Sequence, residues 1–147
     1  MSLFVGIDLG TSAVKVLVLR DDGTTVAKTS AAYPLKPPTH DRTEQSVEDW
    51  WNALVYACRD AMRQVDAREV EAVALSGQLN GLILLDEHLQ PLDDAWIWLD
   101  LRASELTADL EREHGALYRE MVVNPANPIY VGTKLAWLQR ERPELAD

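Results

Sequence analysis

The sequence predicts an α/β protein in which a mixed β-sheet packs against helices. Two observations support this class. The first 33 residues hold three apolar or alternating segments separated by short turns, which predicts an antiparallel meander. A helical pattern then precedes another apolar segment, which predicts a strand parallel to the first, because a parallel connection needs a crossover. Strands, a helix, a strand and further helices, in that order, are typical of a mixed sheet with helices against it.

Each element has its own local signal. Apolar and β-branched runs predict strands, Asp-Gly and proline clusters predict turns and loops, and apolar residues at helical spacing predict helices. Ser46 opens a capping-box-like start, and an apolar stripe follows it as far as Val65. The predicted strands are residues 3–9, 14–19, 24–33, 70–75 and 82–85, with an extended segment at 95–98. One predicted helix begins at Ser46, and two others cover residues 103–114 and 131–140. The predicted loops are residues 34–43, 76–81 and 124–128.

The charge of the chain restricts its partners. The 147 residues include 24 acidic and 14 basic side chains, for a formal net charge of -10. Such a surface repels phosphate backbones and anionic membranes, so we expect neither nucleic acid nor a membrane as partner. It does not exclude one small polyanion, such as a nucleotide, held by backbone amides and a metal. Cys58 is the single cysteine, which rules out an internal disulfide framework and fits a reducing compartment. No leader or spanning segment is recognised, and a cytoplasmic location is expected.

The first candidate site is the turn after the first predicted strand. Asp8 ends that strand, and Gly10 lets the main chain turn sharply close to a ligand. Thr11 and Ser12 add hydroxyls and amides that can wrap phosphate oxygens, and Lys15 adds a cation. The carboxylate can hold a hydrated Mg²⁺ beside them. The alternative is a plain β-turn whose side chains satisfy local amides.

The second candidate site follows the predicted parallel strand. Loops at the carboxyl ends of parallel strands are where α/β sheets bind ligands. Gln78, Leu79 and Asn80 occupy this loop, and the two amide side chains both donate and accept hydrogen bonds, which suits hydroxyl groups. The alternative is a glycine-bounded loop whose amides face water.

The third candidate site is the segment from Trp96 to Arg102. If it is extended, then Trp96, Trp98, Asp100 and Arg102 face the same way. An aromatic ring beside a carboxylate and a guanidinium suits a polyol, since the ring covers C–H faces while the charged groups bind hydroxyls. The alternative is a core tryptophan with an Asp–Arg surface pair worth under roughly 1 kcal/mol.

Several short motifs occur together in one known family. They are Gly6-Ile7-Asp8-Leu9-Gly10-Thr11-Ser12 with Val14-Lys15, Glu44-Gln45, Trp50-Trp51, Ala74-Leu75-Ser76-Gly77-Gln78 with Gly81, Leu84-Leu85-Asp86, Trp98 with Asp100 and Arg102, Asn124-Pro125, Lys134-Leu135-Ala136-Trp137-Leu138, and Pro143-Glu144. With these motifs in this order, essentially the whole chain resembles the N-terminal part of an FGGY-family carbohydrate kinase, closest to the xylulokinases.

This resemblance implies an actin-like ATPase fold of ribonuclease-H type, with residues 1–147 forming the front part of its N-terminal domain. It implies ATP and Mg²⁺ at Asp8, Gly10, Thr11, Ser12 and Lys15. It implies a sugar pocket formed by Gln78, Leu79, Asn80, Trp98, Asp100 and Arg102. Kinases of this family are much longer than 147 residues, and their catalytic base and second domain would come after Asp147, so we expect residues 1–147 alone to be inactive.

The resemblance also leaves alternatives open. Xylulokinases usually carry Met-His where this chain has Leu79-Asn80, so a ketose or polyol other than xylulose is one alternative substrate. Two other classes are an actin-like chaperone or filament ATPase, which shares the Asp-Leu-Gly-Thr turn, and a non-catalytic sugar-binding or interaction fragment. A homodimer is a further expectation.

Overall fold

The computed structural model describes residues 2–145, which fall into two compact units. The first unit combines Met1–Leu35 with Ser46–Gln78, and the second combines Lys36–Gln45 with Leu79–Asp147. Each unit is therefore built from two separate stretches of the chain.

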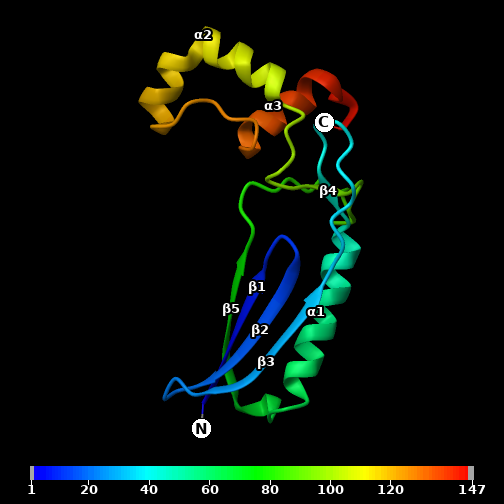
Figure 1. Cartoon of the computed structure of the whole chain (residues 1–147), viewed down its shortest axis with the longest axis vertical. Helices are drawn as coiled ribbons and strands as arrows, with labels where there is room; N and C mark the ends of the chain where they lie inside the picture. The colour runs from blue at the N-terminus through cyan, green and yellow to red at the C-terminus, as the bar shows by residue number, and fades with distance from the viewer. Residues whose placement is uncertain (1, 146–147) are drawn as a thin grey trace. The chain divides into compact units, whose positions relative to one another are not determined.

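The first unit contains a four-stranded sheet. Its strands are β1 (Leu3–Leu9), β2 (Ala13–Arg20), β3 (Thr25–Ala32) and β5 (Val70–Gly77), and their spatial order is β3-β2-β1-β5. β2 is antiparallel to both β1 and β3, whereas β1 and β5 are parallel (Figure 1). The predicted meander and the predicted parallel strand are both confirmed.

Helix α1 (Val47–Met62) packs against β2 and β3. Its buried positions are mostly alanines, among them Ala57 and Ala61, which let the helix approach the buried valines of β2 closely. The Thr29 hydroxyl of β3 donates a hydrogen bond to the Ala57 carbonyl oxygen at 2.8 Å. The predicted cap is present, since the Ser46 side chain accepts a hydrogen bond from the Asp49 N–H at 3.1 Å. A short 3₁₀ helix (Ala67–Glu69) then leads into β5.

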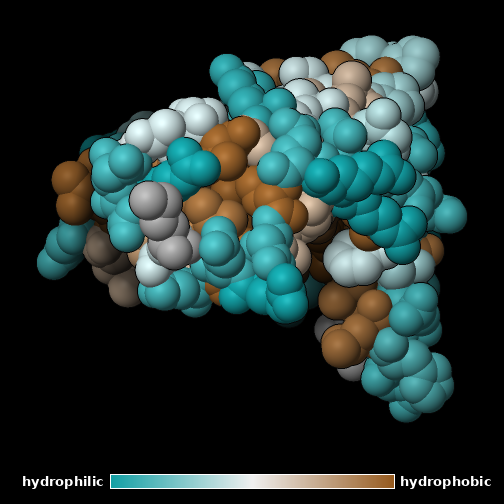
Figure 2. Space-filling model, turned by 90° about the horizontal axis from the view of Figure 1, so that it is seen from below, coloured by the Kyte–Doolittle hydropathy of each residue, from teal (hydrophilic) through white to brown (hydrophobic). Residues whose placement is uncertain are grey.

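Strand β5 lies at the edge of the sheet and is largely open to solvent. Val73 and Leu75 are 61% and 71% exposed, although they project from the same side of the sheet as the buried valines of β2. The reason is that α1 contacts β2 and β3 and does not extend over β5. Figure 2 shows brown apolar side chains at the surface between hydrophilic ones. The sheet therefore keeps apolar area uncovered within the described part of the chain.

Within the described residues, the second unit contains one pair of short strands and two α-helices. β4 (Glu44–Gln45) and β6 (Ala95–Trp96) are antiparallel. They are followed by α2 (Ser104–Val122), α3 (Val131–Glu141) and a 3₁₀ helix at Pro143–Leu145. Figure 1 shows the loop that returns from the end of α2 to the start of α3. Leu82, Trp96 and Leu138 form the buried apolar cluster of this unit, and Trp137 meets Trp96 edge to face at 5.6 Å.

Two predicted elements differ from the structure. Residues 82–85 do not form a strand, and only isolated bridges join Leu82 to Trp96 and Leu85 to Pro91. The predicted helix 103–114 instead covers Ser104–Val122 and ends at Val123, whose φ is 64°. A single glycine after residue 114 costs only about 1 kcal/mol inside a helix, so it does not end one that the following residues continue.

We predict that Ser46→Ala lowers the free energy of unfolding by about 1 kcal/mol, because the Asp49 N–H loses its acceptor at the start of α1. Chemical denaturation measures this loss. Ser104→Ala is the matched control, since α2 has no side-chain cap bond and the Ser104 hydroxyl instead donates to the Leu101 carbonyl at an exposed position. Equal losses for the two variants would contradict the capping role.

Candidate functional site

The turn between β1 and β2 is held by one hydrogen bond within the turn and by two from Tyr33. The Gly10 N–H donates to the Ala13 carbonyl oxygen at 3.1 Å. A Cβ at Gly10 would lie only 3.2 Å from that oxygen, so the turn favours glycine there. Tyr33, directly after β3, donates its hydroxyl to the Gly10 carbonyl oxygen and its N–H to the Ser12 carbonyl oxygen. Hydrogen bonds from Tyr33 thus hold the main chain of the predicted phosphate turn in place.

Tyr33 is itself held in the core of the first unit. Its side chain is buried, and its ring centroid lies 6.4 Å from that of Trp50 on α1. Burial and the negative charge of Asp8 raise the pKa of Tyr33. The phenol therefore stays neutral at ordinary pH and keeps its hydrogen for the Gly10 carbonyl.

Asp8, Lys15 and Ser76 lie side by side across three neighbouring strands. Asp8 is the register partner of Lys15 in the antiparallel pair and of Ser76 in the parallel pair. Directly opposite side chains share a face, and Lys15 alternates with valines buried toward α1. A carboxylate, an ammonium and a hydroxyl therefore share the sheet face opposite α1. A cavity of about 580 Å³ lies there, lined by these three residues and by Lys28 among others.

These residues fit a metal that is shared with a phosphate. Mg²⁺ usually takes one or two carboxylates, keeps several waters and completes its shell with phosphate oxygens. Asp8 supplies one exposed carboxylate beside the turn that carries Thr11 and Ser12. Residues 2–145 contain no group of three or more His, Cys, Asp or Glu side chains that would form an all-protein metal cage. Residues 2–145 also contain no helix long and apolar enough to cross a membrane.

Gln78 lies at the same edge of the sheet as Asp8. Its N–H donates to the Leu9 carbonyl oxygen at 3.0 Å, directly beyond the pairing of Leu9 with Gly77. The second candidate site therefore begins beside the end of β1, because β1 and β5 are neighbouring strands. The predicted loop 76–81 is shorter than expected, because pairing with β1 continues β5 to Gly77.

The other predicted sugar-pocket residues belong to the second unit. Leu79 is exposed, and Asn80 adopts a left-handed conformation with φ 59°. The condition under which Trp96, Trp98, Asp100 and Arg102 would share a face is not met, because the chain turns at Trp98 and the Asp100 N–H donates to the Ile97 carbonyl oxygen at 3.0 Å. Trp98 is 41% exposed, whereas Trp96 is buried in the core.

Asp100 is completely buried, and protein donors occupy both of its carboxylate oxygens. Oδ2 accepts hydrogen bonds from the Thr43 N–H at 2.8 Å and from Arg102 Nη2 at 2.7 Å, while Oδ1 accepts from Arg102 Nε at 2.7 Å. A direct contact of Asp100 with a sugar would have to replace these donors. The Asp100 oxygens tie residues 41–45 to residues 97–102.

Arg102 is also buried and fully engaged within the protein. Its guanidinium lies 3.7 Å from the centroid of the Trp96 ring and binds both Asp100 and Glu44. Burial opposes the charge of Arg102, but the hydrogen bonds that it donates to the two carboxylates, together with their negative charges, outweigh burial and raise its pKa. A direct contact of Arg102 with a sugar would likewise have to replace these partners. This ion pair is a core element, not the surface pair of the alternative interpretation.

Lys134 is a residue at this site to which the sequence analysis gave no role. It lies on α3 with its side chain completely buried. Its Nζ donates to the carbonyl oxygens of Asn80 at 2.7 Å and Ile97 at 2.6 Å. The only sequence signal was its position in the Lys-Leu-Ala-Trp-Leu motif.

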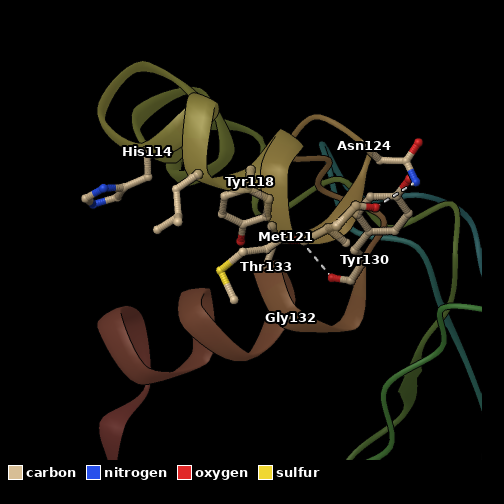
Figure 3. Close-up of a pocket in the computed structure, with 9 residues that line it drawn as sticks. His114, Tyr118, Met121, Asn124, Tyr130, Gly132 and Thr133 are labelled. Atoms are coloured by element: carbon tan, nitrogen blue, oxygen red, sulfur yellow. Dashed lines mark hydrogen bonds between the residues drawn. The ribbon is translucent and has the colours of Figure 1, made fainter.

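A separate cavity of about 620 Å³ lies between α2 and α3. Figure 3 shows Tyr118 and Met121 projecting from α2 toward α3. Asn124, Tyr130 and Thr133 line it as well. This cavity contains none of the predicted site residues, so it is distinct from the candidate site.

Comparison with known proteins gives consistent matches over the full chain. Residues 3–147 match the N-terminal domain of the FGGY family of carbohydrate kinases. The chain is 32% identical over 147 residues to a xylulose kinase of Bacillus subtilis, covering 99% of this chain and 30% of the relative. It is 34% identical over 143 residues to a xylulose kinase of Escherichia coli, covering 97% and 29%.

A solved structure agrees with these sequence matches. The gluconate kinase of Lactobacillus acidophilus superposes with a TM-score of 0.91 at 25% identity, covering 99% of this chain and 30% of that one. The expected mixed α/β fold of actin-like ATPase type is therefore confirmed. This chain spans about 30% of the length of the relatives that it matches.

We predict that Asp100→Asn lowers the free energy of unfolding by about 3 kcal/mol, because the buried Arg102 then loses a charged partner. Asp109→Asn is the control, since the Asp109–Arg112 pair is exposed and should cost less than about 1 kcal/mol. Denaturant titration of both variants measures the difference. An Asp100→Asn protein as stable as the control would show that the buried pair contributes nothing.

Proposed function

The chain belongs to the FGGY family of carbohydrate kinases, and we propose that the protein carrying it transfers the γ-phosphate of ATP to a hydroxyl group of a ketose or polyol, such as xylulose. One observation carries this proposal within the chain. Asp8 and Lys15 lie on one open sheet face, next to a glycine turn that Tyr33 holds in place. Phosphoryl transfer depends mainly on positioning and charge neutralisation, which such a site supplies.

On the phosphate side, Thr11 and Ser12 bind phosphate oxygens through the amides and hydroxyls of the turn, and Gly10 lets the main chain come close to them. Lys15 adds positive charge on the adjoining face. Asp8 would hold the Mg²⁺ that accompanies ATP, which when bound would supply charge neutralisation at the transferred group. The fixed turn supports these roles, because donors already in place need no reorganisation during the reaction.

On the sugar side, Gln78, Leu79, Asn80 and Trp98 remain the proposed contacts. The Asn80 side-chain amide can both donate a hydrogen bond to a sugar hydroxyl and accept one from it. The Trp98 ring offers an apolar face for C–H groups. Asp100 and Arg102 are now assigned to the support of this region instead of to direct contact.

The proton acceptor is assigned to a part of the protein outside these 147 residues. Asp8 is assigned to Mg²⁺ binding and is therefore not free to accept the proton. Asp100 is completely buried, and donors within the protein occupy its oxygens. Residues 1–147 are accordingly the front part of an N-terminal kinase domain and do not by themselves turn over ATP at kinase rates. A homodimer and a cytoplasmic location belong to the same proposal, and the cytoplasm is where ATP is available.

Two other classes are less well supported. A chaperone or filament ATPase would share the turn at Asp8, but the family match is to carbohydrate kinases over nearly the whole chain. A non-catalytic sugar-binding fragment would not need the Asp8–Lys15 pair. Nucleotide turnover by the full-length protein separates both from the kinase.

We predict that Asp8→Asn in the full-length protein lowers sugar-dependent ADP release by roughly 100-fold or more, because Lewis-acid neutralisation is worth several kcal/mol. Sugar affinity should stay within about twofold, measured by calorimetry, since the shape of the side chain is kept. Asp21→Asn, directly after the end of β2 that lies away from the turn, is the control and should keep full activity. A fully active Asp8→Asn enzyme would remove the phosphate-site assignment.

We predict that Trp98→Ala and Asn80→Ala each raise the KM for D-xylulose by about tenfold, while the KM for ATP stays unchanged. Each variant removes a contact worth roughly 1–2 kcal/mol to the sugar. Leu101→Ala is the matched control, since Leu101 is a similarly exposed side chain in the same segment. Unchanged KM values for both site variants would rule out this pocket.

A further inference from the structure

The two segments proposed to contact the sugar are joined to each other by little regular structure. Leu82 and Trp96 exchange two main-chain hydrogen bonds of 2.9 Å. Beyond this bridge, Asn80 takes a left-handed conformation and the chain turns at Trp98. Neither Asn80 nor Trp98 lies in a strand. The main chain at these two residues must therefore be fixed by contacts other than sheet hydrogen bonds.

Lys134 supplies that connection. From α3 its ammonium donates to the Asn80 carbonyl oxygen at 2.7 Å and to the Ile97 carbonyl oxygen at 2.6 Å. Both distances are those of charge-assisted hydrogen bonds. One cation thus binds the peptide after Asn80 and the peptide before Trp98.

We propose that Lys134 is a positioning residue for the sugar site, which fixes the main chain of Asn80 and of Ile97–Trp98 so that the side chains of Asn80 and Trp98 face the substrate together. The inference rests on the proposed function for its substrate. Lys134 does not touch the sugar, since its side chain is completely buried.

The orientation of the Asn80 peptide explains why such an anchor matters. Asn80 has a φ of 59°, a region that is sparsely populated although asparagine enters it more readily than most residues. Rotation of the peptide unit between Asn80 and Gly81 would change ψ of Asn80 and φ of Gly81, and so the direction in which the chain leaves Asn80. A displacement of about 1 Å at a reacting group costs roughly 100-fold in rate.

The burial of a cation at this place is costly, which favours a specific role over general packing. Burial lowers the pKa of Lys134 to about 8, and the nearby Asp100 carboxylate only partly opposes that effect, while Arg102 adds to it. The bonding partners of Lys134 are carbonyl oxygens instead of a carboxylate. An apolar side chain would fill the same space without this cost.

Thr133 offers a matched control on the same helix. It is equally buried, and its hydroxyl lies 2.7 Å from the carbonyl oxygens of Asn127 and Tyr130. Thr133→Val therefore removes hydrogen bonding from two carbonyls of the second unit, as Lys134→Met does, but these carbonyls belong to another loop.

The test compares Lys134→Met and Thr133→Val in the full-length protein, with D-xylulose as the sugar. Lys134→Met should raise the KM for D-xylulose by about tenfold or more and leave the KM for ATP within about twofold, because two charge-assisted bonds to the sugar segments are lost. Thr133→Val should change neither KM by more than about twofold, even if it lowers the melting temperature as much as Lys134→Met does. Equal KM values for D-xylulose in the two variants would overturn the inference.

A second readout does not depend on turnover. Hydrogen exchange followed by mass spectrometry should show faster exchange at residues 79–82 and 96–100 in Lys134→Met and not in Thr133→Val. If wild-type protein shows no sugar-dependent ADP release, the proposed function fails, and unchanged exchange in Lys134→Met separately defeats the anchoring role. If Lys134→Met does not fold, Lys134→Gln is judged by the same criteria. Failure of both to fold would make the role purely structural and overturn the inference.

Discussion

The pairing of β1 with a strand on each side is the constraint on which the phosphate side of the site depends. Antiparallel β2 places Lys15 opposite Asp8, and parallel β5 places Ser76 there as well. The parallel partner requires a crossover, which α1 provides, and α1 lies on the opposite face. The same connection that completes the sheet therefore leaves one face open beside the turn at Gly10.

The second unit is organised by buried charge instead of by a sheet. Asp100 and Arg102 neutralise each other, and the guanidinium stacks on Trp96 while it also reaches Glu44. These contacts join stretches that are more than fifty residues apart in the chain. A buried pair of this kind adds little net stability over an apolar core, but losing one partner is expensive, so it specifies one arrangement of the loops.

Local signals predicted much of the fold and less of the site. The cap at Ser46, the meander and the parallel strand depend on nearby residues or on one crossover, so the sequence was sufficient for them. The sequence could not decide whether the segment from Trp96 to Arg102 is extended, because alternation of residue types cannot reveal the turn at Trp98. The roles of Asp100 and Lys134 were equally hidden, since their partners at Thr43 and Asn80 lie over fifty residues away.

The left-handed conformation of Asn80 bears on how this chain differs from xylulokinases, which usually carry histidine there. Among residues with a side chain, asparagine is one of those that adopt positive φ most readily, so the replacement is compatible with the main chain that Lys134 holds. What changes is the group presented, from an imidazole to a shorter amide that donates and accepts at once. An amide at this position would therefore meet a sugar hydroxyl with a different reach and a different hydrogen-bonding pattern.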